Sequence, residues 1–125
     1  MPSGYSYLYS GTEGAKRHGE QFNEMFTNII RWGQDRGIDD PKAQLNKVLE
    51  ELGEIAHEIN RNHYDVEALE QPEALVDAFG DTFVTLIILC DILNIDPLET
   101  LEHAWEEIKD RTGHLEEGSW VKDEH

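Results

Sequence analysis

The chain has 125 residues, of which 27 are acidic and 10 basic, and its formal net charge at neutral pH is −17. This length suits one domain with a single hydrophobic core. The negative charge argues against a nucleic-acid backbone or an anionic membrane as partner and is compatible with cation binding. The single cysteine, Cys90, excludes an intramolecular disulfide and favours a reducing, cytoplasmic compartment. We expect no secretion signal, because the first residues include neither a basic nor an apolar segment.

The first part of the chain combines a glycine-rich arm with a helix. Residues 1–19 contain four glycines and three tyrosines, and we expect an irregular arm that either lies against a neighbouring subunit or is a free terminus. Apolar residues at helical spacing then predict a helix over residues 20–36, closed by Gly37. On another face of this helix, Asn28 and Trp32 lie one turn apart. This pair either recognises a nucleotide base, by edge hydrogen bonds and stacking, or belongs to the core or to an interface.

The second predicted helix begins at Pro41, after a capping Asp39 or Asp40, and extends to about residue 61. Its apolar residues fall on one side at about 100° per residue and predict packing against a core. These residues are Leu45, Val48, Leu49, Leu52, Ile55, Ala56 and Ile59. The flank and back of the same helix are charged, through Lys47, Glu51, Glu54 and Glu58, with Glu50 to one side.

The segment from Glu73 to Leu93 is predicted to be a helix buried on most sides, because its second half is apolar almost all round. The apolar run is shorter than the about 20 residues that span a bilayer. Glu73, Asp77 and Asp81 nevertheless recur every four residues and form one carboxylate stripe. No Lys or Arg within the segment neutralises them. Either a divalent cation does so, or the stripe is a solvated acidic face near the helix start.

A fourth helix is predicted to begin at Pro97, after a capping Asp96, and to end at Gly113. Its expected inward residues are Leu98, Leu101, Trp105 and Ile108. Near its end, Lys109 and Arg111 either complement the helix dipole or donate hydrogen bonds to phosphate oxygens.

Four helices with short connections and no convincing strand pattern predict an all-α four-helix bundle over residues 20–113. Residues 114–125 are expected to form a short extended tail with a turn at Gly118. The sequence contains no glycine-rich phosphate-binding loop, no nucleophile elbow and no Cys/His zinc spacing. Any nucleotide chemistry would therefore be metal-based.

Three segments, KVLEELGE, DAFGDTFVTLIILCDILNID and LEHAWEEIKDRTG, follow one another in an order and at intervals that resemble the MazG-like all-α nucleoside triphosphate pyrophosphohydrolases. The likeness covers about residues 20–122 and is strongest to the short single-domain forms common in phages. It implies Mg²⁺-dependent cleavage of a nucleoside triphosphate between the α- and β-phosphates, with Mn²⁺ as a substitute metal. It also implies a homodimer or homotetramer, to which Tyr5, Tyr7 and Tyr9 of the arm would contribute.

The family binds Mg²⁺ through an EExxE motif on one helix and an ExxD motif on the next. The residues that match EExxE are Glu50, Glu51 and Glu54, and Asp81 matches the Asp of ExxD. Where the family has the Glu of ExxD, this chain has Ala78, so Asp77, one position earlier, is the expected substitute. The resemblance therefore implies the metal ligands Glu51, Glu54, Asp77 and Asp81. It leaves Glu50, with Glu51 and Glu54, among the expected catalytic residues, as a base or as support for the ligands.

The resemblance also suggests substrate contacts. Lys109 matches the Lys of the family's NxxK motif, whereas Glu106 stands in place of its Asn. Together with Lys47 and Arg111, Lys109 is expected to hold phosphate oxygens. Asn28 and Trp32 are expected to contact the base, for which we favour guanine in dGTP or GTP. The expected substrate-binding residues are thus Asn28, Trp32, Lys47, Lys109 and Arg111.

Three alternatives remain open. Phosphoribosyl-ATP pyrophosphohydrolases share the bundle and the metal motif. A non-catalytic acidic helical interaction protein, such as a nucleic-acid mimic, would have the same charge. A di-iron bundle needs two ExxH pairs, but only Glu54 and His57 have that spacing, and Glu99 and His103 are four residues apart.

Overall fold

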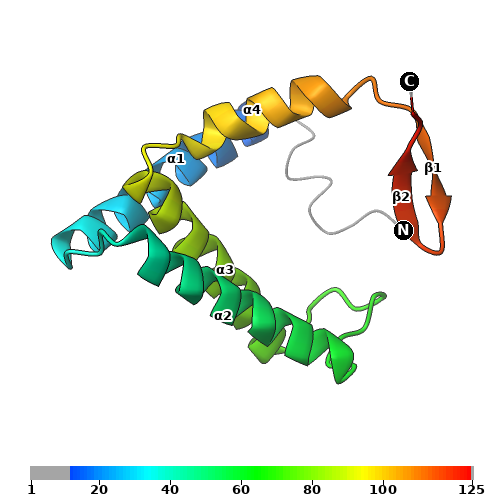
Figure 1. Ribbon diagram of the computed structural model, residues 1–125, viewed down its shortest axis with the longest axis horizontal. Coiled ribbons are helices and arrows are strands. Elements are labelled where there is room, and N and C mark those ends of the chain that lie inside the picture. Colours follow the sequence, from blue (N-terminus) through cyan, green and yellow to red (C-terminus); the bar gives the residue numbers. More distant parts are fainter. Residues whose placement is uncertain (1–11, 125) are drawn as a thin grey trace. The chain divides into compact units, whose positions relative to one another are not determined.

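The computed structural model describes residues 12–124, and four helices make up most of this part of the chain (Figure 1). They are α1 (Thr12–Asp35), α2 (Pro41–Asn60), α3 (Glu73–Ile92) and α4 (Pro97–Ile108), followed by the strands β1 (Gly113–Glu116) and β2 (Ser119–Lys122). The predicted all-α class is confirmed. The chain divides into two compact units, one up to Asn94 and one from Ile95. The first holds α1, α2 and α3, and the second holds α4 and the hairpin.

The predicted starts of α2 and α4 are confirmed by the same capping geometry. The Asp40 carboxylate accepts the N–H groups of the second and third residues of α2, at 3.0 and 3.3 Å. The Asp96 carboxylate makes the equivalent bonds at the start of α4, at 2.9 and 3.4 Å. In each case proline follows as the first helical residue, where its missing N–H group costs no hydrogen bond.

The first helix begins earlier than predicted. α1 starts at Thr12, so the expectation of an irregular arm as far as residue 19 is wrong for its last eight residues, and the rest of the arm, with its tyrosines, lies outside the described residues. Gly14 and Gly19 do not interrupt the helix, because one glycine costs only about 1 kcal/mol and the residues between them favour helix. The helix ends as predicted, with Gly37 in the left-handed region at φ +70°.

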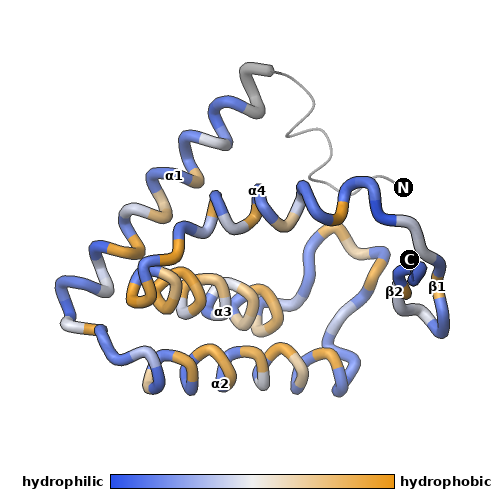
Figure 2. Tube along the Cα trace, turned by 45° about the horizontal axis from the view of Figure 1, so that its top comes forward, coloured by the Kyte–Doolittle hydropathy of each residue, from blue (hydrophilic) through white to orange (hydrophobic). Residues whose placement is uncertain are grey.

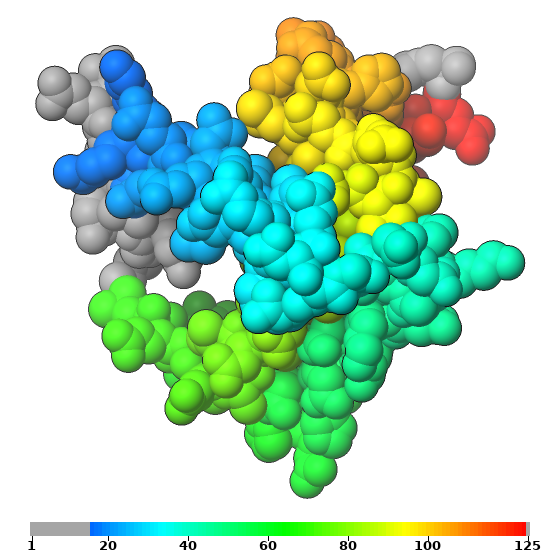
Figure 3. Space-filling view, turned by 90° about the vertical axis from the view of Figure 1, so that its left-hand side faces the viewer, coloured from blue at the N-terminus to red at the C-terminus, as the bar shows by residue number. Residues whose placement is uncertain are grey.

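In the first unit, α2 and α3 run antiparallel side by side, and α1 packs on α3 (Figure 1). A Cβ added to Gly33 of α1 would lie 3.3 Å from the Ile88 side chain, so glycine permits the close approach of these two helices. Gln34 Nε2 also donates a hydrogen bond to Asp91 Oδ2 at 3.2 Å. The end of α1 and the turn after it, cyan in Figure 3, face the viewer there beside the start of α2.

The side of α2 that faces α3 differs from the predicted one. The least exposed residues of α2 recur at helical spacing and are Gln44, Val48, Glu51, Ile55 and Glu58. Gln44 Nε2 donates to the Thr85 carbonyl oxygen at 3.0 Å and so joins the start of α2 to the second half of α3. As a result, five of the seven residues of the predicted core face are exposed, namely Ala56 and, at 46, 55, 46 and 41%, Leu45, Leu49, Leu52 and Ile59. At 100° per residue, the stripe that makes contact is centred about 80° from the centre of the predicted apolar face.

The expectation that α3 is buried on most sides is also wrong. Its buried residues are Leu75, Ala78, Thr82, Ile87 and Ile88. The exposed apolar residues are Val76, Phe79, Phe83 and Leu86 of α3 and Leu93 directly after it, at 55, 41, 61, 45 and 48%. Figure 2 shows how hydrophobic α3 is over most of its length. In the first unit only α1 and α2 pack on it, and two helices cannot cover a third on every side.

The second unit consists of α4 and a hairpin that the sequence predicted only as an extended tail. β1 and β2 pair antiparallel, with Gly113 opposite Lys122, and the predicted turn contains Gly118 at φ +82°. α4 ends at Ile108, so Gly113 does not terminate it. Gly113 is instead the first residue of β1, where any Cβ would collide with the Trp120 ring. The apolar residues of α4 predicted to point inward are exposed, namely Leu98, Leu101, Trp105 and Ile108.

Within residues 12–124, none of the helices taken singly has both the length and the apolar composition to cross a bilayer, whereas α3 and α4 taken together would meet that test by length and composition only.

Candidate metal and nucleotide site

The carboxylates predicted as metal ligands gather along one edge of the α2–α3 pair. On both helices they immediately precede a residue of the helix contact: Glu54 precedes Ile55, Asp77 precedes Ala78 and Asp81 precedes Thr82. One position corresponds to about 100° of rotation. Because the two helices run in opposite directions, the same backward step turns both sets to the same edge of the pair. We call Glu51, Glu54, Asp77 and Asp81 the acidic face.

Glu51 is the member of the acidic face that lies within the helix contact. It is half-buried, whereas the other three carboxylates are exposed. Burial raises the pKa of Glu51 above its ordinary 4.5, and the negative charges of Asp81, Glu50 and Glu54 raise it further, against a lowering by Lys47. Asp81 is the strongest of these charged neighbours although it belongs to the other helix. The structure therefore brings Glu51 of the EExxE segment near Asp81.

Glu50, predicted as a base or as support for the ligands, is paired with a cation. Lys47 Nζ lies 3.3 Å from Glu50 Oε2, one helical turn away, and both side chains are more than half exposed. Such an exposed pair contributes little stability and opens readily. Lys47, the predicted phosphate contact, is thus held beside the acidic face by its ion pair with Glu50. Another anion, such as a phosphate oxygen, can take the place of the Glu50 carboxylate.

The chemistry of the acidic face fits a hard divalent cation, because its donors are carboxylate oxygens and α3 contains no Lys or Arg to neutralise them. The side chains are not arranged as a finished metal site. In residues 12–124 no three His, Cys, Asp or Glu side chains are close enough together to hold an ion. Glu54, Asp77 and Asp81 are exposed, and within residues 12–124 their side chains make no hydrogen bond or ion pair. Their carboxylates can therefore change rotamer.

Asn28 and Trp32 lie on α1, and both are exposed, Trp32 at 47%. The guanidinium carbon of Arg36 lies 4.0 Å from the centre of the Trp32 ring, and Nη1 of Arg36 donates to the Trp32 carbonyl oxygen at 3.1 Å. The sequence analysis missed Arg36, although its position one turn after Trp32 is a signal for such stacking. The described hydrogen bonds and ion pairs connect neither Asn28 nor Trp32 to the acidic face.

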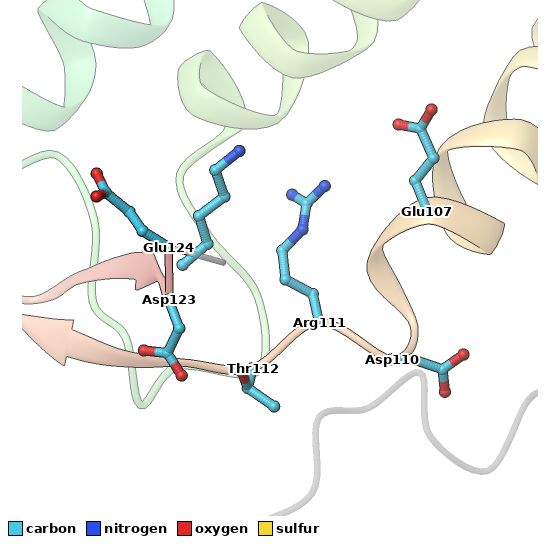
Figure 4. Close-up of a pocket in the computed structure, with 7 residues that line it drawn as sticks. Glu107, Asp110, Arg111, Thr112, Asp123 and Glu124 are labelled. Carbon is cyan, nitrogen blue, oxygen red and sulfur yellow. The ribbon is translucent and has the colours of Figure 1, made fainter.

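The other predicted phosphate contacts belong to the second unit. Lys109 Nζ lies 2.7 Å from Glu106 Oε2, so an acidic side chain three residues earlier already engages this predicted phosphate contact. Arg111 lies beyond the end of α4 and lines a hollow between that helix and the hairpin (Figure 4). Lys122 lines the same hollow and was not predicted. The hollow is mixed in charge, because it is also lined by Glu107, Asp110, Asp123 and Glu124.

Comparison with known proteins gives two relatives without a described function. The chain is 30% identical over 76 residues to an uncharacterized 18.2 kDa protein from the rep-hol intergenic region of Haemophilus phage HP1, a match that covers 58% of this chain and 42% of the phage protein. It is 27% identical over 90 residues to the uncharacterized protein YpjD of Bacillus subtilis. This match covers 70% of this chain and 78% of YpjD. The chain thus matches less than half of the phage relative's length. No family model and no solved structure matches the chain.

Proposed function

We propose that the protein is a magnesium-dependent hydrolase that converts a nucleoside triphosphate to the monophosphate and pyrophosphate. The observation that supports this proposal best is the approach of Asp81 on α3 to Glu51 on α2, which raises the pKa of Glu51. Two helices of a folded protein gain nothing from placing carboxylates together, because like charges at this range repel. A bound cation reverses the sign of that interaction, which gives the arrangement a purpose. The lone, half-buried Cys90 thiol is in keeping with a cytoplasmic enzyme.

In this proposal Glu51, Glu54, Asp77 and Asp81 hold Mg²⁺, and Mn²⁺ can replace it. When bound, the metal neutralises phosphate charge and lowers the pKa of a coordinated water. Glu50 accepts a proton from the attacking water once its carboxylate is released by Lys47, and the Lys47 ammonium then pairs with a phosphate oxygen of the substrate. Lys47 is paired with an anion both before and after this exchange, because a phosphate oxygen replaces the Glu50 carboxylate.

The reaction is an in-line displacement at the α-phosphorus. A bond forms between the water oxygen and the α-phosphorus while the bond from the α-phosphorus to the α,β-bridging oxygen breaks. Pyrophosphate leaves with the electron pair of that bond, and the water proton passes to the Glu50 carboxylate. The products are a nucleoside monophosphate and pyrophosphate. Trp32 offers a stacking surface for a base and Asn28 an amide for its edge, and a guanine nucleotide is our first candidate.

Two other functions use the same residues differently. A phosphoribosyl-ATP pyrophosphohydrolase would have the same chemistry and a bulkier substrate. A non-catalytic acidic protein would need the negative charge and no particular pairing of carboxylates across two helices. The approach of Asp81 to Glu51 across the two helices therefore favours a hydrolase over the acidic binding protein.

The test is a panel of the eight common ribo- and deoxyribonucleoside triphosphates and phosphoribosyl-ATP, incubated with the protein and Mg²⁺ and analysed for monophosphate and pyrophosphate. The proposal expects equimolar release of both products from at least one nucleoside triphosphate, with none in excess EDTA. Phosphoribosyl-ATP as the only substrate would establish the first alternative. No pyrophosphate from any of the nine compounds would overturn the hydrolase.

A further inference from the structure

Gln44 is a buried polar residue in the contact between α2 and α3. Its side chain is 6% exposed, and Val48 is the other buried residue of α2. Nε2 of Gln44 donates to the Thr85 carbonyl oxygen at 3.0 Å, and the Thr85 hydroxyl donates to the Asp81 carbonyl oxygen, one turn earlier, at 2.9 Å. Two hydrogen bonds therefore connect Gln44 to Asp81, the residue of α3 that approaches Glu51.

The bond from Gln44 to Thr85 is the directional part of this helix contact. Within residues 12–124 it is the one side-chain hydrogen bond between α2 and α3, and no ion pair joins the two helices. The rest of the contact is packing, which constrains the level and the rotation of a helix less sharply than a hydrogen bond of fixed length and angle. A single buried polar side chain can specify the register of packed helices for this reason.

Stability alone does not account for a glutamine at this position. Burying an amide costs free energy, and its hydrogen bond mainly offsets that cost. α2 also has a more apolar stripe, one position further along the helix than the residues in contact. Its members are Leu45, Leu49, Leu52, Ala56 and Ile59. Turning α2 by about 100° would bring this stripe to α3 in place of Gln44 and Glu51. The observed orientation therefore has a cause other than apolar burial.

The bond from Gln44 to Thr85 also sets which residues lie level in the antiparallel pair (Figure 1). Glu51 is seven residues, two helical turns, after Gln44 and lies on the same side of α2. The matching level on α3 is seven residues before Thr85, at the buried Ala78. Asp81 is three residues from Ala78, about 4.5 Å along the helix axis. This placement agrees with the raised pKa of Glu51, which burial causes first and the charge of Asp81 second.

We propose that Gln44 is a positioning residue of the acidic face, and that its hydrogen bond to Thr85 holds α2 in the orientation that brings Glu51 to Asp81. Gln44 contacts neither metal nor substrate in this role and acts through Glu51. The chain thereby keeps its acidic face together and leaves a more apolar contact unused. The consequence for metal binding rests on the proposed hydrolase, whereas the orientation of α2 does not.

The test uses Gln44→Met, which keeps an unbranched side chain of similar length and removes the donor. The matched control is Gln34→Met. It makes the same change at a glutamine whose side chain bonds Asp91 and so joins α1, and not α2, to α3. Circular dichroism measures the helix content and the melting temperature of both variants. We expect Gln44→Met to keep the natural helix content and a melting temperature equal to or above the natural one, since an apolar side chain replaces a buried amide.

The first measurement is cross-linking within one chain between Glu51→Cys and Asp81→Cys, in a Cys90→Ser background, by a short bifunctional thiol reagent. Both carboxylates are absent, so the rate depends on the distance between the two positions and not on metal or activity. Mass spectrometry separates products within one chain from products between chains. We expect cross-linking with Gln44 present and with Gln34→Met, and an at least tenfold lower rate with Gln44→Met.

Three outcomes of these measurements would overturn the proposal. The first is an unaltered cross-linking rate with Gln44→Met, and the second is the lack of any cross-link with Gln44 present. The third is a loss of helix content in Gln44→Met, because Gln44 would then be needed for folding and not for orientation.

The second measurement is the affinity for Mn²⁺ with the carboxylates intact. Gln44→Met should weaken binding at least tenfold and Gln34→Met should leave it unchanged. If Gln44 acts by bringing Asp81 to Glu51, Asp81→Asn combined with Gln44→Met should bind no more weakly than Asp81→Asn alone. Additive losses would overturn the positioning role. A natural protein that binds no Mn²⁺ would overturn the proposed hydrolase and the metal-binding part of this proposal, and cross-linking would still decide whether Gln44 orients α2.

Discussion

Glu51 of α2 and Asp81 of α3 interact across two helices although both are acidic. Asp81 raises the pKa of Glu51, after the larger effect of burial, and Glu50 and Glu54 act in the same direction. The two residues are 30 positions apart in the sequence and meet because Glu51 lies in the α2 contact stripe and Asp81 directly precedes Thr82 in that of α3. This relationship links the EExxE segment of α2 to Asp81 of α3.

The pH dependence of stability should reflect this interaction. A raised pKa means that the folded chain holds the Glu51 proton more tightly than the unfolded chain, so the contribution of Glu51 to the free energy of unfolding falls as the pH rises above about 4.5. In EDTA at pH 7, Glu51→Gln should therefore be more stable than the natural protein by a few tenths of a kcal/mol, and the gain should vanish near pH 4. Urea unfolding at both pH values and equal protein concentration measures it. The stability difference between Glu51→Gln and the natural protein is compared at the two pH values. A difference that favours the variant less at pH 7 than at pH 4 would contradict the interaction.

Glu54 is an exposed carboxylate of the EExxE segment that the proposal assigns to the metal, and its replacement should affect activity alone. Glu54→Gln keeps the shape and removes the charge, and we expect pyrophosphate release to fall at least 100-fold, as for the loss of a metal ligand. Because Glu54 is exposed, the melting temperature in EDTA should stay within about 2 °C of the natural value. The matched control is Glu102→Gln, an equally exposed glutamate of α4, which should retain full activity. Equal activity of the two variants would exclude Glu54 as a ligand.

The fold was predicted best where local chemistry decides it. Asp40 with Pro41, and Asp96 with Pro97, set the starts of two helices, because capping depends on residues within one turn. The orientation of α2 was predicted wrongly, since the apolar side chains of the helix are centred between Val48 and Leu49, whereas the stripe that packs against α3 includes Gln44 and Glu51. Which stripe makes contact depends on the residues of α3 that face it. That information is not local to α2.

The site was predicted only in part, because some of its contacts also depend on more than local sequence. Spacing and resemblance singled out the four carboxylates, and the structure brings Glu51 and Asp81 together. The pairing of Lys109 with Glu106 and the stacking of Arg36 on Trp32 depend on rotamers, which a sequence does not contain. The hairpin was missed because its strands have only four residues each and Gly113 was interpreted as a helix terminator.

Trp32 should contribute to substrate binding through stacking. Stacking of a base on an aromatic ring contributes about 1–3 kcal/mol, so Trp32→Ala should raise KM roughly ten- to hundredfold and leave kcat within about threefold. Arg36→Ala should have a smaller effect in the same direction, because Arg36 holds the ring from one side. Trp32→Phe, which keeps a stacking surface, is the control and should recover most of the loss. Steady-state kinetics measure both parameters. A change in kcat alone would contradict a role in base binding.

Gly33 and Gly53 should respond oppositely to the same substitution. Both are helical, but a Cβ at Gly33 would meet Ile88 at 3.3 Å, whereas nothing lies within 4 Å of one at Gly53. Gly53→Ala should stabilise the chain by about 0.5–1 kcal/mol through lower backbone entropy of the unfolded state. Gly33→Ala should destabilise it by about 1–3 kcal/mol, since α1 and α3 must move apart. Urea unfolding of the two variants measures the difference. Equal stabilisation by both would show that α1 does not pack on α3 through Gly33.

The acidic face as a cation site is tested most directly by titrating Mn²⁺ into the nucleotide-free protein and following free Mn²⁺ by its paramagnetic resonance signal. The natural protein and Glu102→Gln should bind Mn²⁺ with equal affinity, and Mg²⁺ should displace it. Asp81→Asn should weaken binding at least tenfold, because it removes the carboxylate that α3 brings to Glu51. Binding by Asp81→Asn that matches the natural protein, or no displaceable Mn²⁺ on the natural protein at all, would contradict the account.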